Sequence, residues 1–261
     1  MRMALFFTLL LICSALHAQR VTGATIDSRL QGTVYQEETA VELKANTAGL
    51  SLAYYKGNLK TYYATSFKKI EIGYIRHPKE YRQSVNRGGS GLSVIIPGSS
   101  YVYGKQHSLL YVKASIGRKR YLSEKTRRKG IAVGYSYEVG PTLGILKPYY
   151  LQVSVENDLG TSADIVSIRY REDNEDIFLD RTAIRAHSGF FEGIDEPSFV
   201  LGVHARGSIH LAPGAYNKFV KAMDIGVQID AFSKRVPIMV IDQNKYVFIN
   251  LFVSVHLGKR S

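Results

Sequence analysis

The chain has 261 residues, a net charge of +12 and one cysteine, Cys13. Loss of an export signal that contains Cys13 leaves 243 residues without a thiol, which excludes disulfides, cysteine metal sites and cysteine nucleophiles. A basic chain can bind nucleic acid, but export argues against such a partner. We therefore expect no nucleic acid, and the basic run from Arg118 to Lys129 is expected either to contact lipid phosphates or to form a solvated turn.

The first eighteen residues have the pattern of a signal peptide. Arg2 precedes an apolar run from Ala4 to Ala15, and the segment ends on small residues at Ala18. The run is too short to cross a bilayer as a helix. We expect residues 1–18 to be removed and residues 19–261 to form a single β-barrel domain.

Hydrophobicity alternates with a period of two along most of the mature chain. From Ile131 to Gly140 the odd positions are large and apolar while the even ones are small or polar. Nine segments alternate in this way: 41–46, 50–55, 68–74, 110–117, 131–140, 149–156, 199–211, 223–230 and 247–258. The pattern predicts an all-β protein.

The composition of the polar face indicates whether the barrel is a soluble one or a membrane one. A soluble barrel has its apolar face inside, whereas a membrane barrel has it outside. Here the polar face mixes both charge signs with many glycines, as expected for a narrow lumen closed by ion pairs. The predicted lumen network is Glu42, Lys44, Lys69, Glu71, Lys113, Glu138, His204, Arg206, Asp224 and Asp230.

Aromatic residues and loop lengths agree with a membrane barrel. Tyrosines such as Tyr54, Tyr55 and Tyr121 lie near expected strand ends, as in interfacial girdles. Lys56 to Asn58 has the composition of a tight turn, whereas Arg76 to Gly104 and Asn157 to Pro197 are long loops.

A closed barrel with both termini on one side needs an even number of strands, so nine segments imply that one is missed, split or false. We expect a closed antiparallel transmembrane barrel of eight strands, with ten as the alternative. The suspect regions are Asp164 to Asp180 and Thr33 to Ala45.

Several segments resemble uncharacterised outer-membrane β-barrel proteins of Bacteroidota. The similar stretches are Gly49–Gly57 (GLSLAYYKG), Arg76–Glu80 (RHPKE), Tyr103–Lys105, Gly140–Leu151 (GPTLGILKPYYL), Val236–Met239 and Phe252–Arg260 (FVSVHLGKR). The resemblance implies a location in the outer membrane and a barrel fold, and it provides no functional residues.

Catalytic candidates occur on two polar faces. His204, Ser208 and His210 share one face of their strand, and Ser254 and His256 share another. A serine needs a neighbouring base to act as a nucleophile, and Glu138, Asp224 or Asp230 could supply the acid. The other interpretation is a lumen network whose groups satisfy one another.

No metal site or cofactor is predicted. His204 and His210 are six residues apart, about 20 Å along a strand, which is too far to share an ion. The sequence therefore predicts a small, non-enzymatic outer-membrane barrel with a plugged lumen, whose loops bind an unknown protein or ligand or support the envelope. The alternatives are a lipid-modifying barrel hydrolase using these serines and histidines, and a soluble periplasmic, lipocalin-like barrel.

Overall fold

The structure is a computed structural model. It describes residues 35–61, 63–84, 100–122, 131–156, 163–189, 191–213, 218–242 and 244–261. The expected signal peptide, residues 1–18, lies outside these ranges.

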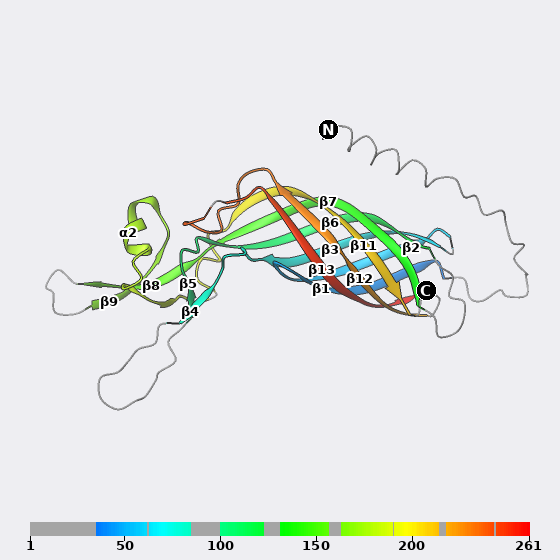
Figure 1. The fold of residues 1–261 in the computed structure, drawn as a ribbon, viewed down its shortest axis with the longest axis horizontal. Helices are drawn as coiled ribbons and strands as arrows, with labels where there is room; N and C mark the ends of the chain where they lie inside the picture. The colour runs from blue at the N-terminus through cyan, green and yellow to red at the C-terminus, as the bar shows by residue number, and fades with distance from the viewer. Residues whose placement is uncertain are drawn as a thin grey trace, which may run out of the picture. The chain divides into compact units, whose positions relative to one another are not determined.

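Eight antiparallel strands close into a barrel, which confirms the predicted fold class and strand number (Figure 1). Each strand pairs with two neighbours, and the first and last strands pair with each other. The barrel strands are β1 (Glu37–Asn46), β2 (Gly49–Leu59), β3 (Ala64–Ile75), β6 (His107–Tyr121), β7 (Ala132–Pro148), β11 (Ser198–Ala212), β12 (Phe219–Phe232) and β13 (Val247–Arg260).

The strand register gives the barrel a strong stagger. A row of paired residues followed once around the wall returns to β13 ten residues from its start. The row passes through Lys259, Thr39, Lys56, Lys68, Ile116, Val139, Ala205, Ile229 and Ile249. Such a stagger goes with strands tilted by roughly 35–45° from the barrel axis. The interior is therefore narrow enough for side chains to fill it.

Apolar side chains cover the outside of the barrel and polar ones fill the inside. On β12, Ile225 and Val227 are exposed while Asp224 and Gln228 are buried. Val133 and Tyr135 on β7 also point outward. The soluble, lipocalin-like alternative requires these two residues to point inward. The structure has the opposite arrangement.

The tyrosines divide between the two faces. Tyr54 points outward, as expected for an interfacial girdle, whereas Tyr55 and Tyr121 are buried in the lumen. The prediction that all three belong to a girdle is therefore wrong for two of them. Their positions in the period-two pattern put them on the polar face.

Seven further elements form a structure outside the barrel, which we call the extension. A three-stranded sheet has the order β10-β8-β9, and β4 pairs with β5. The elements are β4 (Arg82–Ser84), β5 (Ser100–Val102), β8 (Tyr150–Glu156), β9 (Ala163–Arg169), η3 (Glu172–Asn174), α2 (Glu175–Phe178) and β10 (Ile184–His187). Within the described ranges, no helix has the length and apolar character needed to cross a membrane.

The extension explains the odd strand count. Residues 149–156, expected to cross the barrel wall, form β8 in the extension. The suspicion that fell on residues 33–45 was wrong, because this region contains β1 of the barrel. Without the false crossing, both long loops leave the barrel at the end opposite the termini.

The predicted tight turn at Lys56–Asn58 is also wrong. These three residues lie inside β2 and pair with β3 through Phe67 and its neighbours. Gly57 faces the lumen, where a Cβ would come within 2.7 Å of the Tyr55 hydroxyl. The glycine is thus used for close packing in a strand.

An apolar cap closes the barrel at the loop end. The segment after β12 places Val236 and Ile238 fully inside a core formed with Leu109, Leu146 and other wall residues. Gln106 and His107 donate backbone hydrogen bonds to the carbonyl of Ile238. The mouth of the lumen is therefore filled by the chain itself.

Candidate functional site

The lumen contains a balanced set of buried charges. Six acidic and six basic side chains point inward from the barrel strands, and all are buried. They are Glu38, Glu42, Glu71, Glu138, Asp224 and Asp230 with Lys44, Lys69, Lys113, Lys119, Arg206 and Arg260. A buried charge is tolerated when it is paired and hydrogen-bonded, so an equal number of each sign suits a closed interior.

Arg206 lies at the centre of this network. Its guanidinium is 2.6 Å from Glu42, 3.3 Å from Asp224 and 3.7 Å from Glu138. Lys69 links the same acids from the opposite wall, 3.2 Å from Glu42 and 2.6 Å from Glu138. These contacts join strands far apart in the sequence across the lumen.

A second layer of ion pairs lies toward the apolar cap. The amino group of Lys44 contacts Glu71 at 2.6 Å and the side-chain oxygen of Gln228 at 2.5 Å. Lys113 is 2.6 Å from Asp230, which also accepts a hydrogen bond from Gln228 at 2.7 Å. All ten predicted network residues point into the lumen.

A third cluster near the termini was missed from the sequence. Glu38 contacts Lys119 at 2.6 Å and Arg260 at 2.7 Å. Lys119 continues the inward positions of the alternation through Lys113, so periodicity could have found it. Lys119 lies in a run of basic residues, and such a run indicates an exposed surface. The run therefore did not predict that Lys119 is buried.

Little space remains between these layers. The cavity bordered by Glu42, Lys119, His210 and Asp224 has a volume of about 10 Å³, roughly the minimum for a single water molecule. This cavity is too small to hold a molecule larger than water. The barrel interior is therefore a packed polar core.

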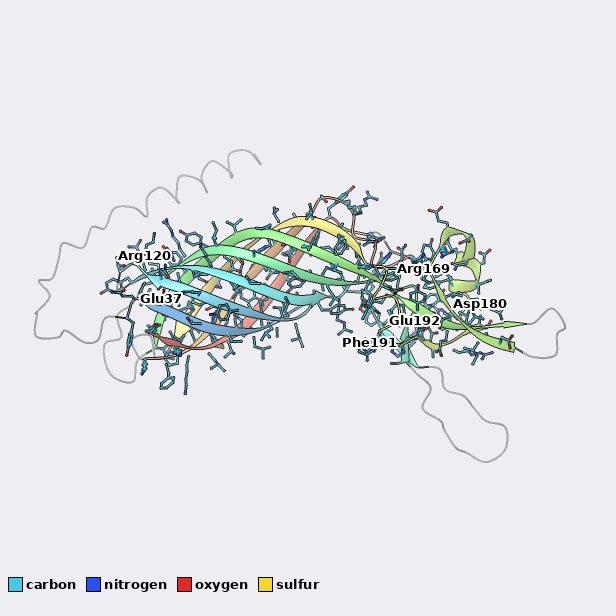
Figure 2. The ribbon with its side chains drawn as sticks, turned by 180° about the vertical axis from the view of Figure 1, so that it is seen from behind. Glu37, Arg120, Arg169, Asp180, Phe191 and Glu192 are labelled. Atoms are coloured by element: carbon cyan, nitrogen blue, oxygen red, sulfur yellow. The ribbon has the colours of Figure 1, made fainter. Side chains whose placement is uncertain are left out.

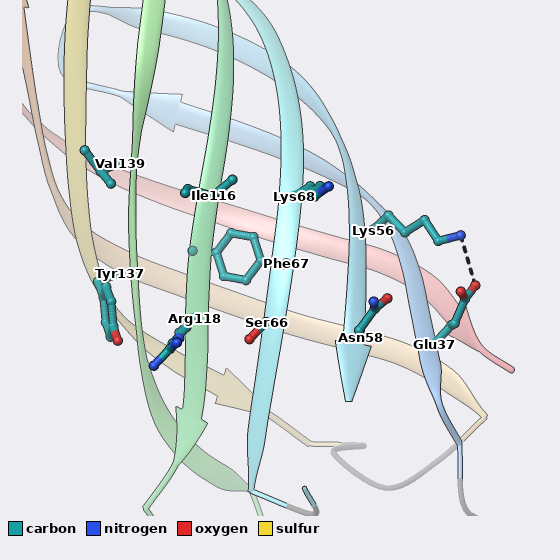
Figure 3. A pocket seen from close by; sticks show the side chains of 11 residues that line it. Glu37, Lys56, Asn58, Ser66, Phe67, Lys68, Ile116, Arg118, Tyr137 and Val139 are labelled. Atoms are coloured by element: carbon teal, nitrogen blue, oxygen red, sulfur yellow. Dashed lines mark ion pairs between the residues drawn. The ribbon is translucent and has the colours of Figure 1, made fainter. Parts of the chain in front are cut away.

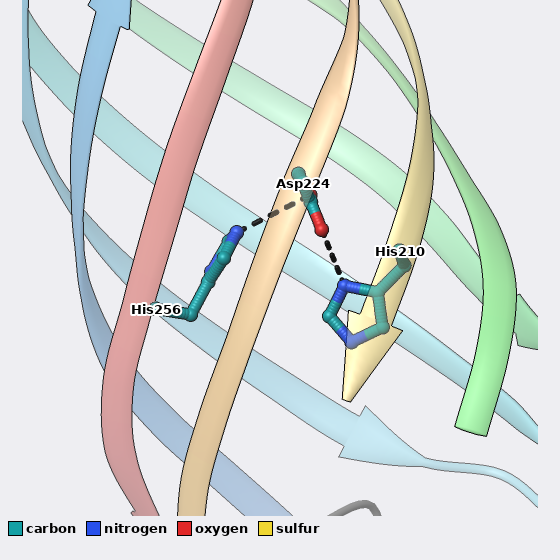
Figure 4. A group of neighbouring side chains, drawn as sticks. All are labelled: His210, Asp224 and His256. Carbon is teal, nitrogen blue, oxygen red and sulfur yellow. Dashed lines mark hydrogen bonds and ion pairs between the residues drawn. The ribbon is translucent and has the colours of Figure 1, made fainter. Parts of the chain in front are cut away.

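Three of the predicted catalytic residues meet around Asp224, and Figure 4 shows two of them, His210 and His256. One carboxylate oxygen is 2.5 Å from Nδ1 of His210, and the other is 3.2 Å from Nε2 of His256. Ser208 donates a hydrogen bond to the same carboxylate at 3.3 Å. The serine thus contacts the acid rather than a histidine.

The remaining candidates lie in other contacts. His204 is hydrogen-bonded to Thr142 at 3.0 Å and to Ser115 at 3.3 Å. Ser254 accepts a hydrogen bond from Arg206 at 3.1 Å. Among the hydrogen bonds of the described side chains, none joins a predicted serine to a predicted histidine, so the order of groups in a catalytic triad is not formed.

His210, Asp224 and His256 are also the residues best placed to hold a metal ion in the described part of the chain. Their ligand atoms all lie within 4.8 Å of one another. Both histidines, however, direct a ring nitrogen at an oxygen of Asp224 rather than at a shared empty point. An ion would have to replace these contacts, of which the one from His210 is a hydrogen bond.

The basic run divides between the two faces of β6. Lys119 enters the lumen, whereas Arg118 and Arg120 are exposed on the outside. Residues 123–129, which complete the predicted run, lie outside the described ranges. Figure 2 shows Arg120 and Glu37 at one end of the barrel, and Arg169, which belongs to β9 of the extension, beyond the opposite end.

The extension has an apolar core of its own. Leu151 and Val153 from β8 pack with Phe178 of α2 and Ile184 of β10, and all four are buried. Phe178 is fully enclosed although α2 has only four residues. The helix is too short to be stable by itself, so this packing holds it in place.

A buried ion pair lies at the base of the extension, and a hydrogen bond connects it to the barrel strand β3. Lys105 lies 3.1 Å from Glu80 and donates a hydrogen bond to the Tyr74 hydroxyl at 2.7 Å. Burial lowers the pKa of Lys105, and the nearby carboxylate of Glu80 opposes this shift. The charge of Lys105 is therefore held by one carboxylate in a site with little water.

Strand β9 presents an open edge. Among the described strands it pairs only with β8. Ile165 and Val166 are exposed on its opposite faces, at 58% and 45%. Edge strands offer unpaired backbone groups to other chains and are usually blunted by charge or proline, and the middle of β9 has neither.

Comparisons with known proteins show neither a family nor a function for this chain. No family model matches the sequence, and no curated protein matches it. Among solved structures, one similar chain is Ail, the attachment invasion locus protein of Yersinia pestis, crystallised with the heparin analogue sucrose octasulfate. The two are 8% identical with a TM-score of 0.39 over 87% of this chain and all of Ail. At these values the likeness says nothing about a ligand of this chain.

Proposed function

We propose that the protein is a small, non-enzymatic outer-membrane barrel that displays a binding module, the extension, on the cell surface. The observation that carries this proposal is the inverted barrel, with charges inside and a continuous apolar face outside. Its membership in the Bacteroidota family that the sequence resembles is part of the same proposal.

The exposed apolar surface supports a membrane location. Leu43 on β1, Leu251 on β13 and Ile70 on β3 are each about 60% exposed. A soluble protein rarely exposes a contiguous apolar surface of this extent, whereas lipid removes the cost of exposing it. Backbone groups in lipid must be paired internally, and a closed barrel satisfies this requirement.

The loop lengths support the orientation. Outer-membrane barrels have short periplasmic turns and longer external loops. Here the extension and the cap segment emerge at the end opposite the termini. The termini therefore face the periplasm in this proposal, and β9 faces the outside of the cell.

Strand addition is the binding mode that the extension supports best. An extended peptide can pair with an open strand edge and take specificity from alternate side chains. Ile165 and Val166 would provide apolar contacts on the two faces of the new sheet. The lipid-modifying hydrolase remains the other candidate function, and it would require the packed lumen to open around Ser208 and His210.

Single-cysteine labelling tests location and orientation together. We expect tagged protein in the outer-membrane fraction, with folded and boiled forms migrating differently on a gel. An Ile165→Cys variant should react with a membrane-impermeant maleimide in intact cells, while a Ser261→Cys variant should react only after permeabilisation. Release with soluble periplasm would refute the membrane barrel, and the reverse labelling pattern would refute the orientation.

A further inference from the structure

A hollow on the outer wall of the barrel combines basic and apolar side chains (Figure 3). It has a volume of about 620 Å³ and extends over β2, β3, β6 and β7. Lys68 and Arg118 line it on opposite sides of Phe67, and Ile116 and Val139 provide apolar surface. The ring of Phe67 lies at its floor, against Gly117, where a Cβ would come within 2.5 Å of the ring.

Cations outnumber anions in the lining of this hollow, three to one. Lys56 and Lys68 are directly paired across β2 and β3, an arrangement in which like charges repel. Glu37 lies 3.1 Å from Lys56 and offsets its charge. Among the described side chains, neither Lys68 nor Arg118 has an ion-pair partner, so this surface has an excess positive charge.

The position of the hollow matches the edge of a membrane. Arg118 pairs across strands with Tyr137, and Arg120 pairs with Tyr135. The two tyrosine rings are stacked, with centroids 6.4 Å apart. Tyrosine and basic residues together are typical of the level of lipid headgroups, and the purely apolar surface begins at Val139.

We infer that this hollow binds the phosphate of an anionic glycerophospholipid in the leaflet nearest the termini. Lys68 and Arg118 would contact the phosphate, and Ile116 and Val139 would contact the upper part of an acyl chain. This inference rests on the proposed membrane location and adds a specific lipid site to it. Anionic headgroups are attracted by each nearby lysine or arginine.

Native mass spectrometry of the full mature chain, folded in dodecyl maltoside, tests the site with two probes, dioleoyl phosphatidylglycerol and dioleoyl phosphatidylcholine. We expect a preference for phosphatidylglycerol. Replacing both cations, Lys68→Gln with Arg118→Gln, should weaken its binding about tenfold. The exchange Lys68→Arg with Arg118→Lys keeps the charge and should keep the preference.

A matched control removes the same charge elsewhere at the same barrel end. Lys221 and Lys259 are also exposed there, on β12 and β13. The pair Lys221→Gln and Lys259→Gln should change phosphatidylglycerol binding by less than about twofold. Equal loss in both pairs, or no lipid preference in folded wild-type protein, would overturn the lipid site and leave the membrane barrel standing. Failure of wild-type protein to fold in the detergent would overturn both proposals.

Discussion

The barrel and the extension use the same alternating strands with opposite sides buried. In the barrel, Arg206 and Asp230 are buried while Val227 is exposed. In the extension, Leu151 and Val153 of β8 are buried, and the polar residues that alternate with them, Gln152 and Ser154, are partly exposed. Alternation specifies two faces, and the solvent around the sheet decides which face is inside.

The change between the two arrangements takes place within one run of chain. Strand β7 ends at Pro148 and β8 begins at Tyr150, with a single residue between them. Along β7 the inward side chains pass from Glu138 through Thr142 to Leu146, so the charged lumen gives way to the apolar cap. The difference between the regions can therefore be tested by matched substitutions on either side.

The largest expected effect is the loss of one lumen charge. Replacing Lys113 with methionine leaves Asp230 unpaired in the interior and should lower the free energy of unfolding by about 3–5 kcal/mol. The double variant Lys113→Met with Asp230→Leu should recover much of this loss, because no charge is left alone. Urea titration followed by the heat-modifiability gel measures each variant. A double variant less stable than both singles would contradict a network held by charge balance.

A charge placed on the outer wall should have the next largest effect. Val227 lies between Gly207 and Leu251 in the middle of the apolar face, and Val227→Arg should cost about 2–4 kcal/mol in a bilayer. In the matching variant, Ile165→Arg on β9, the new side chain faces water. This variant should change the free energy of unfolding by less than about 0.5 kcal/mol. Folding yields into lipid vesicles compare the two. Similar losses would mean that both surfaces meet the same solvent.

A smaller effect is expected at the base of the extension. Glu80→Gln removes the carboxylate opposite Lys105 and should weaken local packing by about 1–3 kcal/mol, seen as faster proteolysis of the extension with the barrel intact. The change lowers the pKa of Lys105 further. The buried amine then loses its proton more readily than in the unfolded chain. The loss of stability relative to the wild-type protein should therefore shrink as pH rises toward 10.5, the ordinary pKa of a lysine side chain.

Two observations would contradict this account of the base. One is an unchanged proteolysis rate in Glu80→Gln. The other is an equal increase in the control Glu172→Gln, whose side chain is exposed on η3.

The smallest effect is expected for an exposed ion pair. Lys56 and Glu37 are 3.1 Å apart, close to the spacing of the lumen pairs, but both are about half exposed. Lys56→Ala should therefore change stability by less than about 1 kcal/mol and by less still in high salt. A loss of stability comparable to that of Lys113→Met would show that burial does not determine how much an ion pair contributes to the free energy of unfolding.

The sequence predicted which face of its strand each network residue occupies, but it did not predict the ion-pair partners of that residue. Period-two alternation assigns Lys44 and Arg206 to the polar face without any knowledge of pairing. Their contacts with Glu71 and Glu42 depend on register across several strands. The meeting of His210 and His256 at Asp224 likewise requires β11, β12 and β13 to be aligned, which no local pattern specifies.

The extension could not be separated from the barrel by periodicity alone. Leu151 and Val153 alternate with polar neighbours in the same way as barrel residues, because β8 also has one buried face. What distinguishes β8 is the chain that follows, where β9 pairs back upon it outside the barrel. Pairing partners, rather than composition, define the boundary.

The near continuity of β7 and β8 has a mechanical consequence. A partner that pulls on β8 would apply force along the axis of β7, which is hydrogen-bonded to β6 and to β11 over most of its length. Force in that direction loads many backbone hydrogen bonds at once, in shear, instead of opening them one after another. The extension is thus attached to the wall by a connection suited to bearing tension.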